Sequence, residues 1–158
     1  MTESSSRIAQ ITLDERLVVR RNSNVEHERA VAISDLLHEN SFVPVSKVPG
    51  PYHLHLGIEE NRLALDIRDT HGQDLERVVM PLAPFRGIVK DYFLVCESYY
   101  NAVRTASPTR IEAIDMGRRA LHDEGSELLR ERLADRVSVD FNTARRLFTL
   151  LCVLHIRG

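Results

Sequence analysis

The chain has 158 residues, of which 43% are hydrophobic and 28% charged, a composition typical of a globular domain and not of a disordered or fibrous protein. Its formal net charge is −2, and no long block of Lys or Arg is present, which argues against nucleic acid as a partner. No apolar run approaches the ~18 residues of a membrane span. We therefore expect a cytoplasmic protein with no membrane segment, one domain over residues 1–158, and disorder in residues 1–6.

Residues 7–81 are predicted to form a strand-rich half with one helix. The segment "RIAQITLD" (7–14) alternates apolar and polar residues, as a half-buried strand does. Ser23 and Glu26 have the spacing of a capping box at the start of a helix over about 24–38. The inward stripe of that helix is expected to be Ala30, Ile33 and Leu37.

The clearest strand pattern is "YHLHLGIEENRLALDIR" (52–68), in which apolar residues occupy every second position. A short strand over 42–45 precedes it. Turns at Glu60-Asn61 and His71-Gly72 would fold 52–81 into a three-stranded antiparallel meander. A slip of one residue would turn the apolar side chains outward, so the register is well determined. The predicted partners are Ile58 with Leu63, Leu56 with Leu65, Leu54 with Ile67, Leu65 with Val78, Leu63 with Met80, Asp66 with Arg77 and His53 with Arg68.

Residues 82–158 are predicted to form a helical half, because the apolar period changes there from two to 3.6. The expected helices are 84–104, one from a Ser107 cap to Gly125, a shorter one over 126–136, and a last one over 141–157 after an Asp140 cap. The last helix is apolar almost all round and is expected in the core. The fold class is therefore α+β: a small, mainly antiparallel sheet packed by the N-terminal helix and the C-terminal helical half.

The segment "IDMGRRALHDEG" (114–125) concentrates charge on one side of its helix. Advancing about 100° per residue, Asp115, Arg118, Arg119 and His122 fall in one arc. This arc is interpreted either as a solvated, internally paired face or as an anion clamp in which His122 acts as acid or base. On the opposite side, which we expect to be buried, small residues would let another helix approach closely; they are Ala113, Gly117 and Ala120.

The last helix carries a narrow polar stripe that includes Arg145 and Arg146. An arginine largely buried there needs a carboxylate or a bound anion, because an unpaired buried charge is costly. Two interpretations follow: an arginine–carboxylate bracket between helices, or a phosphate- or carboxylate-binding site. The expected protein partners in a bracket are Asp91, Glu97 and Asp115.

Metal and nucleophile patterns are weak in this sequence. His53 and His55 have His-X-His spacing on one strand face, but no clear third and fourth ligand accompanies them, so we predict no metal and no cofactor. Cys96 and Cys152 lie in apolar helical segments and are expected to be buried, reduced core residues. No glycine-rich phosphate loop, G-x-S-x-G, C-x-x-C or H-E-x-x-H motif is present.

Four segments carry a family resemblance: "VEHERAVAI", "VKDYFLVCESYYNAV", "IEAIDMGRRALHDEGSELL" and "DFNTARRLFTLLCVLHIRG". Through them the chain resembles, over essentially its full length, an uncharacterised family of small bacterial cytosolic proteins. The match is looser between residues 42 and 81. Because that family has no established activity, the resemblance implies a bacterial cytosolic single domain and transfers no functional residue.

The leading functional hypothesis is a non-enzymatic binding or regulatory protein that engages a partner protein or small anionic ligand through its arginine-rich helices. The candidate binding residues are Arg118, Arg119, Arg145 and Arg146. The alternative is a hydrolase or transferase acting on a phosphorylated or carboxylated metabolite, with His122 as acid or base. A third hypothesis is a homodimer formed through the exposed face of the meander or an apolar helix edge.

Overall fold

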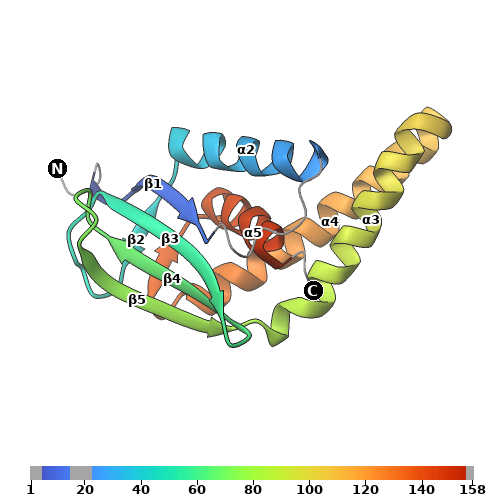
Figure 1. The fold of residues 1–158 in the computed structure, drawn as a ribbon. Helices are drawn as coiled ribbons and strands as arrows, with labels where there is room; N and C mark the ends of the chain where they lie inside the picture. The colour runs from blue at the N-terminus through green and yellow to red at the C-terminus, as the bar shows by residue number, and fades with distance from the viewer. Residues whose placement is uncertain (1–4, 15–22, 156–158) are drawn as a thin grey trace.

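The structure is a computed structural model that describes residues 5–14 and 23–155 (Figure 1). It has an α+β architecture, which confirms the predicted fold class. In chain order the elements are β1 (Ile8–Leu13), α2 (Ser23–His38), β2 (Phe42–Pro44), β3 (Tyr52–Glu59), β4 (Arg62–Arg68), β5 (Asp74–Pro81), a 3-10 turn (Ala83–Phe85), α3 (Arg86–Thr105), α4 (Pro108–Leu133), β6 (Val137–Val139) and α5 (Phe141–His155).

The main sheet has the strand order β1-β3-β4-β5. Strands β3, β4 and β5 form the predicted antiparallel meander, and all seven predicted residue partners are confirmed. Glu60 and Asn61 make the first turn with φ angles of 52° and 63°, the left-handed backbone that a two-residue hairpin turn of this hand requires. The first strand, β1, is added parallel to β3, so the sheet is mixed.

A separate two-stranded sheet joins β2 to β6. Strand β6 was not predicted from the sequence, because three residues between two helices are too few to show a period of two. Its two valines are buried and pair with the residues that flank Val43 in β2. This pairing ties the N-terminal half to the segment between α4 and α5.

The last helix, α5, is central, as predicted. Figure 1 shows it below α2, with the main sheet on one side and the α3–α4 hairpin on the other. Asp140 caps it by accepting a hydrogen bond of 2.8 Å from the backbone N–H of Thr143. The residues it buries are Thr143, Ala144, Leu147, Phe148, Leu150, Leu151, Cys152, Val153 and Leu154.

The predicted helix end at Gly125 is wrong, since α4 continues without interruption to Leu133. A glycine after a helical segment usually signals a C-terminus. Here Gly125 is buried inside the helix and faces the ring of Phe148, and a Cβ at this position would overlap that ring. The glycine therefore provides room for close packing of α5 and does not end the helix.

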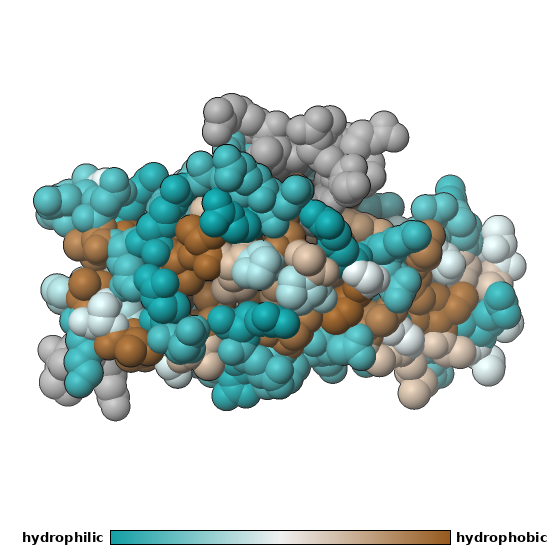
Figure 2. Space-filling model, turned by 90° about the horizontal axis from the view of Figure 1, so that it is seen from below, coloured by the Kyte–Doolittle hydropathy of each residue, from teal (hydrophilic) through white to brown (hydrophobic). Residues whose placement is uncertain are grey.

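The orientation predicted for α4 is also wrong. Its small residues do not contact another helix: Ala113 and Ala120 are exposed, and no atom lies within 4 Å of a Cβ built on Gly117. Met116 on the same side is 64% exposed, and Figure 2 shows apolar surface along the hairpin end of the molecule. The inward side instead includes His122 and Gly125, because these two contact the Phe148 ring. The charged arc is thus partly turned inward.

Helix α2 buries only part of the predicted stripe. Ile33 is half-buried and packs against the core, but Ala30 and Leu37 are exposed. Val25, Ala32 and Leu36 are buried instead. The buried stripe has helical spacing but passes through Glu28, a carboxylate between Val25 and Ala32. A hydrophobicity pattern does not reveal a stripe that a charged residue interrupts.

The predictions for the chain ends are tested only in part. The carbonyl oxygen of Ser6 accepts a 3.0 Å hydrogen bond from the backbone N–H of Phe42, so order extends into the segment predicted to be disordered. Residues 1–4, the capping side chain of Ser23 and the predicted helical residues 156–157 lie outside the described part of the chain. Within the described residues, no helix is both long and apolar enough to cross a membrane.

The Gly125–Phe148 contact predicts a stability difference between two glycines of one helix. Gly125→Ala should lower the free energy of unfolding by about 1–2 kcal/mol, because overlap with the Phe148 ring should cost an amount in the upper part of the ~1–3 kcal/mol range for overpacking and better helix propensity returns about 1 kcal/mol. Gly117→Ala, in open space, should leave stability unchanged or raise it. Urea unfolding of both variants measures the difference, and equal stabilities would contradict this packing.

Candidate anion-binding site

A cavity of about 280 Å³ lies among α2, α3, α4 and α5. It brings together the five candidate site residues that the sequence singled out on two different helices: Arg118, Arg119, His122, Arg145 and Arg146. The other residues lining it are His27, Glu28, Val31, Ala32, Tyr92 and Thr149.

Two arginines of α4 share one carboxylate. Asp115 Oδ1 accepts hydrogen bonds of 3.0 and 2.5 Å from Nε and Nη2 of Arg118, and its Oδ2 accepts one of 2.5 Å from Arg119. These bonds hold the pKa of the Asp115 carboxyl below its ordinary value. The guanidinium of Arg118 also lies 4.7 Å from the centre of the Tyr99 ring, a cation–π contact. A single negative charge therefore fixes two positive ones at the cavity wall.

The arginines of α5 are held more loosely. Arg145 Nε lies 3.5 Å from Asp123 Oδ1, and Arg146 Nη2 lies 3.6 Å from Asp35 Oδ2. The partners predicted from sequence were wrong: Asp115 pairs within α4, and Asp91 and Glu97 are exposed. The partner of Arg146 comes from α2, whose packing against α5 the sequence did not indicate.

One donor at this site lacks an acceptor. Among the described residues, Arg145 Nε is a buried side-chain nitrogen that makes no hydrogen bond, although Asp123 is near enough for an ion pair. A buried donor left unsatisfied costs roughly 1–3 kcal/mol, and more when it is charged. Such a group calls for an explanation, and a bound water or ion is one of those that apply to native proteins.

His122 is packed into the cavity wall. Its side chain forms ring contacts with Tyr92 and Phe148, each at a centroid distance of 5.3 Å. Its Nε2 lies 2.7 Å from the hydroxyl of Thr149, and its Nδ1 lies 3.4 Å from that of Ser126. Both ring nitrogens therefore have neighbours within the protein.

The surroundings of His122 keep its imidazole neutral. Burial, together with the positive charges of Arg145, Arg118 and Arg146, lowers its pKa from 6.5 to about 4. The imidazole is therefore in its neutral form, with one N–H, at neutral pH. An anion placed among these arginines would reduce their effect and favour the protonated form.

Sequence reasoning missed Glu28, the one acidic side chain among the residues lining the cavity. It comes from α2, and its Oε1 accepts a 3.2 Å hydrogen bond from the Tyr100 hydroxyl. Burial raises the pKa of Glu28 above its ordinary value. The sequence feature that could have identified Glu28 is its position, at helical spacing between Val25 and Ala32, which are both buried.

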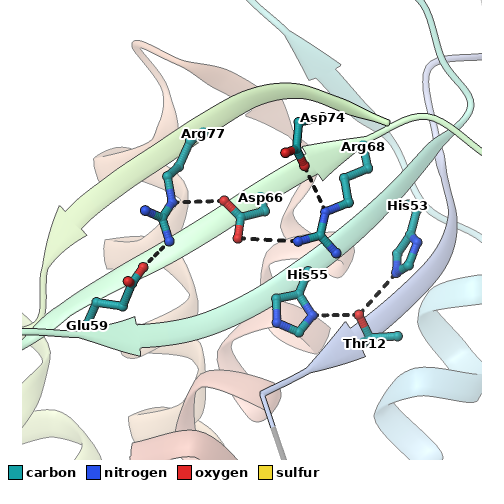
Figure 3. Close-up of polar contacts among 8 residues, drawn as sticks. All are labelled: Thr12, His53, His55, Glu59, Asp66, Arg68, Asp74 and Arg77. Carbon is teal, nitrogen blue, oxygen red and sulfur yellow. Dashed lines mark hydrogen bonds and ion pairs between the residues drawn. The ribbon is translucent and has the colours of Figure 1, made fainter. Parts of the chain in front are cut away.

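A second polar cluster covers the outer face of the main sheet (Figure 3). Asp66 lies 2.8 Å from Arg77 Nε and 3.9 Å from Arg68, which in turn contacts Asp74 at 3.0 Å. Arg77 also pairs with Glu59. These charges neutralise one another across strands, which is an ordinary stabilising arrangement on an antiparallel sheet.

The weak metal candidates lie at the edge of this cluster. Figure 3 shows His53 and His55 pointing toward Thr12 of β1, whose hydroxyl oxygen is 3.1 Å from His53 Nε2 and 2.7 Å from His55 Nδ1. Within the described part of the chain, no group of three or more His, Cys, Asp or Glu side chains could hold a metal ion. Each imidazole instead has a hydroxyl partner.

The two cysteines are free and buried, as expected. Burial raises the pKa of Cys96 to about 11 and that of Cys152 well above its ordinary value. A nucleophilic thiol needs the opposite shift. Both side chains are therefore core residues in this arrangement.

The chain matches the sequence profile of the uncharacterised protein family UPF0262 over residues 5–157. A UPF0262 protein of Azorhizobium caulinodans is 59% identical over 161 residues, covering 99% of this chain and 98% of that protein. One from Paramagnetospirillum magneticum is 57% identical, covering 96% and 97%, and one from Rhodopseudomonas palustris strain TIE-1 is 55% identical, covering 99% and 96%. No solved structure matches the chain.

The neutral state of His122 predicts how stability depends on pH. The pKa of this residue is lower in the folded chain, about 4 against 6.5, so the unfolded state takes up a proton first as pH falls. The stabilising contribution is complete above about pH 6.5 and declines by about 1.4 kcal/mol per unit down to pH 4. Comparison with His122→Gln in urea unfolding isolates this residue. A stability difference between the two proteins that stays constant from pH 7 to 4 would contradict a buried neutral imidazole.

Proposed function

The chain belongs to the UPF0262 family, whose name carries no activity, and we propose from its cavity that it binds a small anionic ligand. The ligand class is a phosphorylated or carboxylated metabolite, held by Arg118, Arg119, Arg145 and Arg146. The observation that carries the proposal is the convergence of these four arginines on one cavity.

The charge balance supports an anion. Four guanidinium groups face three nearby aspartates, because Asp115 serves both Arg118 and Arg119. Of the side chains that line the cavity itself, four are arginines and one, Glu28, is acidic, and burial raises the pKa of Glu28 above its ordinary value. Arginine suits this task because its planar group donates two parallel hydrogen bonds to a carboxylate or phosphate. A bound anion would supply the acceptors that Asp123 and Asp35 provide only at ion-pair distance.

The alternative function is an enzyme with this cavity as its active site. The observation that favours it is that His122 and the four arginines line the same cavity. The chemistry of His122 weighs against it. An imidazole with a pKa of about 4 is neutral at neutral pH, so it has no imidazolium proton to donate and is a weak general base, and hydroxyl groups already flank both nitrogens. Binding, with His122 as part of the wall, is therefore the function we propose. The free thiols support a reducing, cytosolic location.

Arg145→Met tests the proposal with inorganic phosphate as the probe. We expect the wild-type chain to bind phosphate in calorimetry, and the variant to bind at least about tenfold more weakly, a loss typical of removing a charged hydrogen-bonding partner. Its free energy of unfolding should change by no more than about 1 kcal/mol, because the pair with Asp123 is partly exposed.

Arg62→Met is the matched control. Arg62 is an exposed arginine of β4 that pairs with Glu60 and does not line the cavity, so its loss should leave phosphate binding unchanged. If the wild-type chain binds no phosphate and Arg145→Met loses several kcal/mol of stability, the arginines form an internal bracket and the proposal is wrong.

A further inference from the structure

A second cavity, of about 430 Å³, lies between α2 and α3. Its inner wall is apolar or aromatic: Val25 and Cys96 are buried, and Phe93 and Tyr100 are half-buried. Its rim consists of exposed polar residues, namely Asn24, Glu97, Asn101 and Arg104. An apolar wall with a polar rim is the usual composition of a site for an uncharged part of a small molecule.

The two cavities follow one another along α2. Residues 24, 25 and 28 line the second cavity, and residues 28, 31 and 32 line the first, so Glu28 belongs to both. The stretch from Asn24 to Ala32 spans roughly 12 Å at 1.5 Å per residue. On α3, Tyr92 lines the first cavity and its neighbour Phe93 lines the second. The two cavities thus adjoin one another at Glu28.

The two linings differ in charge and in aromatic content. Four arginines line the first cavity, whereas the second has one arginine, Arg104, at its rim and the rings of Phe93 and Tyr100 in its wall. Glu28 receives a hydrogen bond from Tyr100 on one carboxyl oxygen, which leaves the other oxygen as an acceptor at the junction. Together the two volumes fall in the range of typical ligand sites, roughly 300–1,000 Å³.

We propose that the ligand of this protein is an elongated molecule with an anionic group at one end and an apolar, aromatic body at the other. The anionic group occupies the arginine cavity, a hydroxyl or amino group of the ligand donates to Glu28, and the body lies against Phe93 and Tyr100. This inference rests on the proposed anion site and adds the class of ligand.

Calorimetry with inorganic phosphate and 2-naphthyl phosphate tests the inference. We expect the naphthyl ester to bind at least about tenfold more tightly than phosphate, because its two fused aromatic rings are partly buried in the second cavity. Phe93→Ala should reduce that advantage to about threefold or less while phosphate affinity stays unchanged. Leu94→Ala is the control, because Leu94 is the neighbouring residue of α3, is 56% exposed and lines neither cavity.

A second variant guards against a folding defect in Phe93→Ala. Glu97→Trp places a bulky ring at the exposed rim of the second cavity, and it should abolish the naphthyl advantage without affecting phosphate. Equal affinity for both probes, or a naphthyl advantage that survives both variants, would overturn the elongated ligand and leave the anion site standing. Failure of both probes to bind would overturn the anion site itself.

Discussion

The close approach of α5 to α4 at Gly125 determines the rest of the arrangement. The Phe148 ring occupies the space that a side chain at position 125 would fill, and it meets the His122 ring edge-on at 84°. The helices are therefore near enough for His122 to reach Thr149 across the interface. One helical turn away, the same contact places Arg145 beside Asp123. Without this glycine the cavity would have a different shape.

Several arginines lie beside the core, and the contacts that hold them differ. Arg118 combines two hydrogen bonds to Asp115 with a ring contact to Tyr99. Arg145 and Arg146 keep only longer ion pairs, and they are the side chains with the most hydrogen-bonding capacity to offer a ligand. Burial, reinforced by the positive charges of Arg145, Arg118 and Arg146, lowers the pKa of His122 and keeps its ring neutral.

The meander of β3, β4 and β5 could be predicted in detail because two sequence patterns agreed. The alternation of apolar and polar residues showed which side chains of β3 and β4 face the core, and the need to pair apolar residues such as Ile58 and Leu63 determined the register. The helices were harder to predict because the apolar pattern was the main evidence for each, and it was ambiguous. Gly125 is a residue type that often follows a helix end, and Glu28 interrupts the apolar stripe by which α2 faces the core.

The candidate site was predicted by residue type and not by geometry. Arginines in an apolar helix and a His–Arg cluster were unusual enough to notice, and the structure places both at one cavity. Their carboxylate partners could not be assigned, because pairing depends on which face of α4 turns inward and on the contact of α2 with α5. The sequence shows directly which residue types are present. It does not show how far a helix is rotated about its axis, because that rotation depends on packing between residues distant in the sequence.

The central claim is that an anion binds among the arginines that surround His122. NMR titration of the His122 imidazole, with and without saturating inorganic phosphate, tests it most directly. The account predicts a pKa of about 4 without phosphate and an upward shift of about 1 unit or more with it, because a nearby negative charge favours the protonated ring. An identical titration curve in the presence of phosphate would contradict the account.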